Sequence, residues 1–403
     1  MTIRDSASER RALADRLAAS GELTSRSWRA AVEAVPRELF VQPGVFLPTG
    51  DGRWRPVTAR AVGPSEWAQI VYSDQSLVTQ LDGHLTADRT TGPVAGFPTS
   101  SSTLPATVVG MAEVLGVEDG QSVLEIGTGT GYSTALMCHR LGEDSVTSVE
   151  VDPEVAARAD AALEAAGYST WTVVGDGLLG HPRRAPYDKV IATLAVRRIP
   201  YAWVRQTRPG GTILATVGSW SYGTGLAKVT VRDDGTAEGG IVGRSSFMPA
   251  RSQAALPIAG DLSARTAYAD TERRTLLGPH LLDEWMPAFL AQLAAPGAQL
   301  LHAMADGNRT TYLFDPGRES FAEIRDDGTG WTVCQGGPVA LWDAVEGSLA
   351  AWQDAGRPDI TTVRLRITDR SHIYWMGGQA IASGPRADPA GETSALRWEH
   401  RIA

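Results

Sequence analysis

The sequence predicts an α/β fold with a mainly parallel sheet, and three observations support this prediction. An apolar run at 123–126 is followed by glycines at alternate positions, Gly127, Gly129 and Gly131. A helical pattern begins directly after the last glycine. A second apolar run, 146–151, follows that helix and ends in acidic residues. A strand, a glycine-rich turn, a helix and a second strand in this order form the first unit of nucleotide-binding α/β folds.

The glycine turn can bring a ligand against bare backbone. Glycine tolerates the sharp turn and has no side chain that would hold the ligand away, and the next helix presents free N–H groups. Glu125 precedes the glycines, at a position where a dinucleotide fingerprint has an apolar residue. Glu150 and Asp176 follow the second and third strands, where a carboxylate can accept hydrogen bonds from both ribose hydroxyls.

These three acids distinguish between possible cofactors. S-adenosylmethionine (SAM) has a ribose, an adenine and a cationic sulfonium but no diphosphate. An acid before the turn favours a cation and disfavours a diphosphate, so we expect SAM rather than NAD or FAD. The expected cofactor contacts are Glu125, Gly127, Thr128, Gly129, Gly131, Tyr132, Glu150, Val151, Asp176 and Gly177.

Length and composition exclude several classes of protein. The chain has 403 residues, enough for two or three domains, and 43% of them are hydrophobic. The net charge is −9 and no long block of Lys or Arg is present, so we expect no nucleic-acid partner. No apolar run reaches transmembrane length and the N-terminus has no signal pattern. We therefore expect a soluble, cytoplasmic protein without a membrane partner.

The cysteines and histidines do not predict a metal site. Cys138 and Cys334 are the two cysteines, and neither lies in a CxxC spacing. The seven histidines are scattered and form no HxxxH pair. We expect neither a disulfide framework nor a bound metal.

Patterns along the chain predict two domains. Residues 1–253 form the SAM-binding domain, in which the N-terminal part, 1–98, consists of helices and loops; we expect helical patterns at 7–35, divided at Gly21, and irregular segments at 50–66 and 83–100. Beyond that part we expect helices at 105–115, 153–166 and 200–207 and strands at 171–174, 187–193, 211–217, 225–232 and 240–248.

A smaller α+β domain, 254–403, completes the predicted chain. Its expected helices are 278–294 and 338–355, and its expected strands are 301–314, 331–334 and 361–368. We expect this domain to help bind a peptide substrate.

A cluster of hydroxyl residues, Thr99-Ser-Ser-Ser-Thr103, precedes the helix that begins at Pro105. It has two interpretations. A hydroxyl just before a first-turn proline suits an N-cap, which would make the cluster structural. Alternatively, one hydroxyl faces the methyl donor, and Thr103, Ser102 and Ser101 are then the candidate catalytic residues.

Several motifs, taken together and in order, resemble those of the protein-L-isoaspartate O-methyltransferases. They are Val35-Pro-Arg-Glu-Leu-Phe-Val41, Tyr72-Ser-Asp74, Leu124-Glu-Ile-Gly-Thr-Gly-Thr-Gly-Tyr132, Gly175-Asp-Gly177, Tyr187-Asp188, Gln206, Arg208-Pro-Gly-Gly211 and Phe247-Met-Pro249. The resemblance implies a class I SAM-dependent methyltransferase fold, Rossmann-like with N-terminal helices, and a carboxyl O-methyltransferase activity.

The chain departs from this family at two places near the expected site. Family enzymes carry a Ser-x-Pro whose serine lies at the active site, and this chain has Thr103-Leu-Pro105 with Ser101 and Ser102 beside it. The resemblance therefore leaves the acting hydroxyl open. The loop after the fourth strand, which is alanine-rich in the repair enzymes, reads Leu194-Ala-Val-Arg-Arg198 here.

The chain in its extended form, with a tail beyond residue 250, resembles methyltransferases of ribosomal peptide (RiPP) maturation, in graspetide (ATP-grasp) and lanthipeptide systems. The supporting segments are Thr99–Thr103, Ile191-Ala-Thr193, Gln206-Thr-Arg-Pro-Gly210, Leu341-Trp-Asp-Ala-Val-Glu346, Trp352 and Gly356-Arg-Pro358. This resemblance implies methylation of an aspartyl side chain in a modified, macrocyclic precursor peptide, whose ester collapses to an aspartimide (succinimide) or isoaspartate. The alternative is repair of isoaspartate in damaged proteins.

Either reaction places the same demand on the protein. A carboxylate is ionised at neutral pH, since the pKa of aspartate is about 3.9, and needs no general base. The site must instead align the carboxylate with the methyl group at roughly 3 Å, a task that neutral hydroxyls suit. Two other classes stay open: a catalytically idle peptide-binding protein that keeps SAM, and a nicotinamide enzyme.

Overall fold

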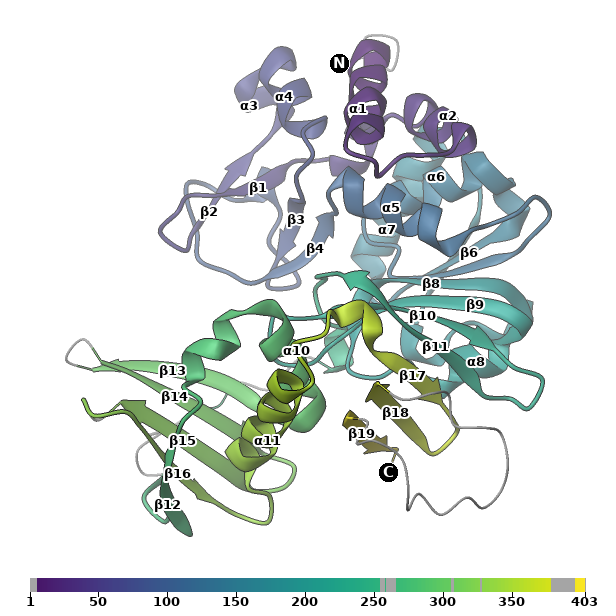
Figure 1. The fold of residues 1–403 in the computed structure, drawn as a ribbon. Coiled ribbons are helices and arrows are strands. Elements are labelled where there is room, and N and C mark those ends of the chain that lie inside the picture. The colour runs from purple at the N-terminus through teal and green to yellow at the C-terminus, as the bar shows by residue number, and fades with distance from the viewer. Residues whose placement is uncertain are drawn as a thin grey trace. The chain divides into compact units, whose positions relative to one another are not determined.

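The computed structural model describes residues 6–253, 258, 266–305, 308–326, 328–377 and 396–402. The chain divides into two compact units (Figure 1). Unit 1 comprises Met1–Thr193 and Ala202–Leu214, and unit 2 comprises Leu194–Tyr201 and Ala215–Ala403. These units differ in their bounds from the expected domains 1–253 and 254–403, because the strands of 225–244 belong to unit 2.

Unit 1 contains the predicted parallel sheet. Its strands are β5 (Val123–Ile126), β6 (Val146–Glu150), β7 (Trp171–Val174), β8 (Tyr187–Val196) and β9 (Thr207–Val217), and the last two also contribute residues to unit 2. The order is β9-β8-β5-β6-β7, with β5 parallel to both β6 and β8. All four residues of β5 are buried, as expected for a central strand of a sheet covered on both faces. The predicted α/β fold class is confirmed.

The helices of this part follow the predicted start signals. They are α5 (Pro105–Leu115), α6 (Tyr132–Leu141), α7 (Pro153–Ala165) and α8 (Tyr201–Gln206). Helix α7 is capped by Asp152, whose carboxylate accepts from the N–H groups of Glu154 at 2.9 Å and Val155 at 3.2 Å. Proline at its first position and the acidic cap explain why sequence patterns located this helix correctly.

The N-terminal part of unit 1 contains more structure than the sequence predicted. The predicted helices are present as α1 (Ala7–Ala19) and α2 (Arg26–Ala34), with Gly21 at φ 84° after α1, and η2 (Arg37–Val41) follows. A four-stranded sheet and three short helices lie between residues 45 and 102, partly within the expected irregular segments. These elements are β1 (Val45–Pro48), β2 (Trp54–Val57), α3 (Ala59–Val62), α4 (Pro64–Val71), β3 (Leu77–Leu81), η3 (Ala87–Arg89) and β4 (Pro98–Ser102).

That sheet has the order β2-β1-β3-β4. Its core is a small cluster of Phe46, Val78, Leu81 and Ala87. Strands of four or five residues that include prolines carry too few alternating positions to be recognised as strands. The prediction of a loop at 50–66 was therefore wrong, whereas 83–97 is irregular as expected apart from η3, and β4 begins at Pro98.

Unit 2 contains an antiparallel set of strands in the order β19-β18-β17-β11-β10. They are β10 (Gly225–Val231), β11 (Ala237–Arg244), β17 (Arg364–Ile367), β18 (Ser371–Met376) and β19 (Leu396–Arg401), and η7 (Arg251–Gln253) and η9 (Ile360–Thr362) lie between them in sequence. Pairing of β11 with β17 joins 237–244 to the C-terminal part of the chain. This pairing is long-range in sequence, so local patterns placed the domain boundary elsewhere.

A second, five-stranded antiparallel sheet completes unit 2, in the order β12-β16-β15-β14-β13. Its elements are β12 (Thr271–Thr275), η8 (Pro279–Asp283), α10 (Trp285–Ala294), β13 (Gln299–Ala305), β14 (Asn308–Asp315), β15 (Ser320–Asp326), β16 (Trp331–Gly336) and α11 (Leu341–Asp354). Helix α11 packs against β14, β15 and β16 (Figure 1). The single strand expected at 301–314 is in fact the hairpin β13–β14.

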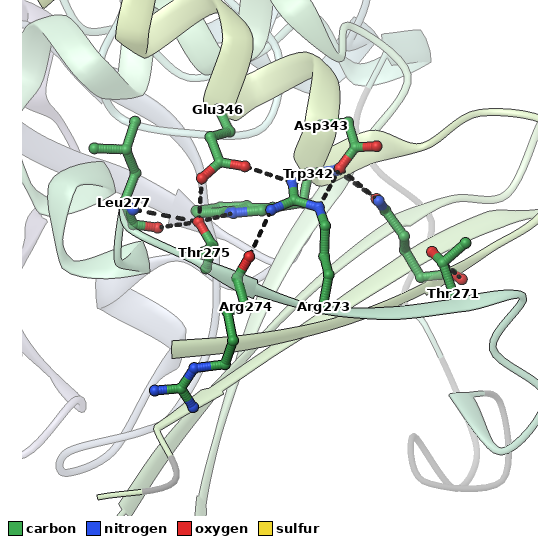
Figure 2. A network of polar contacts seen from close by, with 9 residues as sticks. Thr271, Arg273, Arg274, Thr275, Leu277, Trp342, Asp343 and Glu346 are labelled. Atoms are coloured by element: carbon green, nitrogen blue, oxygen red, sulfur yellow. Dashed lines mark hydrogen bonds and ion pairs between the residues drawn. The ribbon is translucent and has the colours of Figure 1, made fainter. Parts of the chain in front are cut away.

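A polar network joins α11 to the edge strand β12, as Figure 2 shows. The Arg273 guanidinium donates to Asp343 at 3.0 Å through Nε and also contacts Glu346. The Trp342 indole donates to the Thr275 hydroxyl at 3.3 Å. The motif Leu341–Glu346 thus has an internal structural task.

In the described part of the chain, no helix is long and apolar enough to span a membrane.

Candidate active site

The three glycines of the turn between β5 and α6 differ in what surrounds them. All three have positive φ, at 93° for Gly127, 55° for Gly129 and 86° for Gly131, a conformation that side chains other than glycine rarely adopt. A Cβ on Gly131 would lie 3.3 Å from the Cβ of Ala159, so this glycine allows α7 to pack closely. A Cβ on Gly129 would meet only the carbonyl oxygens of Ser101 at 3.7 Å and Gly127 at 4.0 Å. Gly129 therefore provides the bare backbone on which a ligand can lie.

Glu125, expected to face the cationic end of the cofactor, is fully buried. Its carboxylate accepts from the Ser148 hydroxyl at 2.7 Å and from the hydroxyls of Ser133 and Thr134. Burial raises the pKa of this carboxyl, and the three hydroxyl donors oppose that rise. The side chain joins β5, β6 and the first turn of α6, so it positions the glycine turn; a direct contact with the cofactor stays a prediction.

Glu150 and Val151 lie at the same turn. One oxygen of Glu150 accepts from the Gly129 N–H at 2.9 Å and the other from the Asp152 N–H at 3.1 Å. The side chain of Val151 is 46% exposed. The buried Thr128 and Ser148 hydroxyls lie 2.6 Å apart and tie the turn to β6. The structure thus brings the predicted second-strand acid to the open glycine.

Asp176 is exposed and begins a loop that other elements hold in place. Its Oδ1 accepts from the Leu178 N–H at 2.9 Å. The Trp203 indole N–H donates to the Gly177 carbonyl at 2.8 Å, and the Gln206 amide donates to the Leu179 carbonyl at 2.8 Å. Trp203 is fully buried. Sequence analysis did not connect Trp203 with the Asp176 loop, because a short helix gives no sign of its partner.

The interpretation of the hydroxyl cluster as a helix cap was wrong. Helix α5 has Leu104 at its N-cap position, without a side-chain cap. Its free N–H groups are satisfied instead by Asp74, which accepts from Ala106 at 2.9 Å, and by Ser76, which accepts from Leu104 at 3.1 Å. The serines belong to β4 and pair with β3, and the last of them, Ser102, lies two residues before the N-cap position.

Burial separates the three candidate hydroxyls. Ser102 is 1% exposed, and its hydroxyl oxygen lies 3.4 Å from Nε of Arg37. Ser101, in β4, and Thr103, directly after the end of β4, are both half-buried. The Ser101 carbonyl is also the nearest neighbour of the open side of Gly129. The structure therefore brings β4 to the glycine turn.

Arg37 is the residue that sequence analysis missed. Its side chain is fully buried, and the guanidinium donates to backbone carbonyls at 2.6–3.3 Å on two segments of the site. The acceptors are the carbonyls of Val71, Ser73, Gln75, Ser102 and Thr103. Burial lowers the pKa of Arg37 to about 10, so the group stays charged at neutral pH. Arg37 lies in a quoted motif, but only the fold shows that it holds the end of β4.

Tyr132, also expected to contact the cofactor, is 2% exposed. Its ring lies 5.8 Å from the Phe40 ring and 5.8 Å from Cζ of Arg37. Burial raises the pKa of Tyr132 to about 12. The structure thus places it in the interior behind the turn, next to Arg37, and its contact with the cofactor stays a prediction.

The surroundings of the turn fit SAM. An open backbone at Gly129, the Glu150 carboxylate beside it and the exposed Asp176 combine close approach with hydrogen-bond acceptors for a ribose and a cation. The described residues include no group of three or more His, Cys, Asp or Glu placed to hold a metal ion. Cys138 and Cys334 are buried free thiols.

Comparisons with known proteins agree with this geometry. A family model described as protein-L-isoaspartate(D-aspartate) O-methyltransferase matches residues 65–255. A protein-L-isoaspartate O-methyltransferase of Ignicoccus hospitalis is 34% identical over 211 residues, which cover 52% of this chain and 82% of that protein. One of Hyperthermus butylicus is 30% identical over 272 residues, covering 65% of this chain and 93% of that protein.

A solved structure bearing the same name shares the fold. It superposes with a TM-score of 0.51 at 22% identity and covers 89% of this chain and 96% of its own. The first 253 residues alone could not supply that share, so the similarity extends into the C-terminal part. The chain belongs to the protein-L-isoaspartate(D-aspartate) O-methyltransferase family and is a SAM-dependent carboxyl O-methyltransferase.

Proposed function

We propose that the chain methylates the side-chain carboxylate of an isoaspartyl residue in a protein or peptide. One observation carries the proposal: β4, with the half-buried hydroxyls of Ser101 and Thr103, is held beside the open backbone of Gly129. The names of the curated relatives support isoaspartate as the substrate.

The residues of the site are suited to orientation rather than proton transfer. A substrate carboxylate is ionised at neutral pH, since its ordinary pKa is about 4, and SAM supplies the electrophilic methyl group when bound. The hydroxyl of Thr103 or Ser101 donates a hydrogen bond to the carboxylate and fixes its direction of approach. The Arg37 charge is engaged by backbone carbonyls, so it holds β4 without clamping the substrate anion.

The three hydroxyls have different proposed roles. Thr103 occupies the register of the family serine and is half-buried, which makes it the first candidate for contact with the substrate. Ser101 is also half-buried and is the second candidate. Ser102 is buried beside Arg37 and serves as a positioning residue.

A second candidate is methylation of an aspartate in a modified, macrocyclic ribosomal peptide, followed by collapse to an aspartimide. This second candidate is favoured by two departures from the repair enzymes, Thr103-Leu-Pro105 and Leu194–Arg198. In unit 2, Nη1 of Arg198 donates to the Arg401 carbonyl at 2.7 Å, so this arginine has a structural task. A peptide partner and a cytoplasmic location stay predictions.

A competition between three peptides tests the proposal. The purified protein is given methyl-labelled SAM with an isoaspartyl peptide, its linear aspartyl isomer or a macrocyclic aspartyl peptide, and base-labile methyl ester is counted. We expect the isoaspartyl peptide to be labelled fastest. Labelling of the macrocycle alone, with a product that has lost water, would instead establish the second candidate, and absence of ester from all three would refute both.

Single variants test the roles of the hydroxyls. We expect Thr103→Ala to lower kcat/KM for the isoaspartyl peptide about 10–100-fold, because an oriented hydrogen bond is lost, with SAM affinity unchanged. Thr107→Ala, on helix α5, is the matched control. If Thr103→Ala has no effect and Ser101→Ala does, the acting hydroxyl is that of Ser101; if neither has an effect, hydroxyl orientation is wrong.

A further inference from the structure

A groove outside the proposed methyl-transfer site runs along the outer edge of the parallel sheet. Strand β7 is the end strand of the order β8-β5-β6-β7, parallel to β6, with Trp171 opposite Thr147 and Val174 opposite Glu150. No strand in the described ranges pairs with its other edge. The groove has a volume of about 840 Å³ and is lined by 171–174 together with residues of the loop before β8.

The edge strand exposes apolar side chains to an unusual degree. Trp171 and Val174 are each 56% exposed. An exposed, apolar edge strand is a template for pairing with another chain, and folded proteins normally protect such edges with charge, proline or a covering element. The edge of β7 therefore has the properties of a surface that another polypeptide covers.

A basic wall faces this edge. His181, Arg183 and Arg184 line the groove, against one acid, Asp144. Cζ of Arg184 lies 4.9 Å from the centroid of the Trp171 ring, and the same guanidinium donates to the Asp144 carbonyl. Burial lowers the pKa of His181, and the charges of the two arginines lower it further, as expected in a locally positive surface.

Two buried polar atoms of the groove lack a partner among the described residues. They are Nη1 of Arg184 and the hydroxyl oxygen of Thr172. A buried guanidinium nitrogen without an acceptor is costly. A carboxylate oxygen placed there would satisfy it with a charge-assisted hydrogen bond.

We propose that this groove binds an extended, acidic peptide segment, which adds as a strand to β7 and places a carboxylate on Arg184. Strand addition uses the backbone of the free edge for affinity and the pockets beside it for selection of side chains. A second copy of this chain is a poorer occupant, because it would bring its own two arginines to the same edge. The proposal does not depend on which carboxylate the enzyme methylates.

Calorimetric titration with a short probe peptide tests the proposal. The probe is an acetylated octapeptide of alternating Val and Glu. The first comparison peptide has Gln in place of every Glu. The second is the Val/Glu peptide with N-methyl groups on the amides that would face the edge of β7. We expect the acidic probe to bind at least about tenfold more tightly than either comparison peptide, since charge-assisted and backbone hydrogen bonds are each lost. Equal affinity of all three peptides would overturn the proposal.

Variants locate the binding site on the protein. Arg183→Gln/Arg184→Gln should reduce affinity for the acidic probe at least about tenfold, with methyl transfer to the isoaspartyl peptide unchanged. Arg11→Gln/Arg60→Gln, which removes two exposed arginines of α1 and α3, is the charge-matched control. If the double variant does not fold, Arg183→Gln alone and the N-methylated peptide provide the same test. Peptide binding would be contradicted if the groove variants bound the acidic probe with unchanged affinity. It would also be contradicted if light scattering showed a dimer that Trp171→Glu dissociates.

Discussion

Unit 1 and unit 2 each bury an ionisable side chain. The side chain in unit 1 is charged at neutral pH, whereas the one in unit 2 is neutral. Arg37 of unit 1 is surrounded by five backbone carbonyl acceptors and keeps a pKa of about 10. His372 of unit 2 has one backbone acceptor, the Ile199 carbonyl, which lies 3.0 Å from Nε2. Its Nδ1 has no partner among the described residues. Burial, with the nearby His400 and Arg198, lowers its pKa to about 3.

The difference shows that the ordinary pKa of a buried group decides whether its charge survives: burial lowers both pKa values, but arginine starts at 12.5 and histidine at 6.5. Arg37 is charged and uses its donors to hold the segments at 71–75 and 102–103. His372 is neutral and, since a carbonyl only accepts, carries its proton on Nε2. The charged group positions a site, whereas the neutral group packs against Tyr374, 6.4 Å between ring centroids.

The largest expected effect comes from removing the buried charge of unit 1. Arg37→Met leaves the carbonyls of Val71, Ser73 and Ser102 without their donor, so we expect the free energy of unfolding to fall by about 3–5 kcal/mol. Urea denaturation followed by circular dichroism measures it. Arg37→Lys should recover part of the stability but little methyl transfer, because one ammonium cannot reach both segments. A loss below about 1 kcal/mol would show that these hydrogen bonds are not needed.

The second effect concerns the neutral histidine of unit 2. Because the pKa of His372 is near 6.5 when unfolded and about 3 when folded, the unfolded chain binds more protons between these values. Stability should therefore fall as pH is lowered from about 6.5 towards 3, by about 1.4 kcal/mol per pH unit for this one group. Urea denaturation at successive pH values measures the slope, and His372→Gln should make it shallower. An identical slope in the variant would contradict the assignment.

A smaller effect distinguishes the two glycines of the turn. Gly129→Ala puts a Cβ into the open space beside Ser101, so we expect SAM affinity to fall at least about tenfold, or about 1.4 kcal/mol. Gly131→Ala instead meets Ala159 at 3.3 Å and should lower the free energy of unfolding by about 1–3 kcal/mol. Calorimetric titration with SAM and thermal unfolding separate the two. Unchanged SAM binding in Gly129→Ala would remove Gly129 from the site.

The smallest effect is expected in the exposed network of unit 2. The side chain of Arg273 is 34% exposed, and its partner Asp343 is 51% exposed, so solvent screens the pairing. We expect Arg273→Met to cost about 0.2–1 kcal/mol in urea denaturation and to leave SAM affinity unchanged. If the free energy of unfolding fell as much as in Arg37→Met, the expected difference between buried and exposed arginines would be contradicted.

Local patterns were sufficient for the elements whose signals lie within a few residues. The run at 123–126 with its glycines and the run at 146–151 predicted the parallel sheet and the turn correctly; the contact of Glu150 with the cofactor stays a prediction. They failed for β4, because the hydroxyl residues have no alternation of polar and apolar types to mark a strand. The cap of α5 was assigned to the wrong segment for a related reason: Asp74 is 32 residues from its partner Ala106.

The sequence by itself determined the fold class, the glycine turn and the family, because side-chain periodicity, caps and motifs are properties of neighbouring residues. Only the tertiary structure decided that Ser102 is buried while Thr103 and Ser101 are half-buried, that Glu125 is enclosed by three hydroxyls, and that Arg37 holds the end of β4. These facts depend on which distant segments supply donors and acceptors. A chain folds to satisfy such groups across long separations, and no local pattern records those partners.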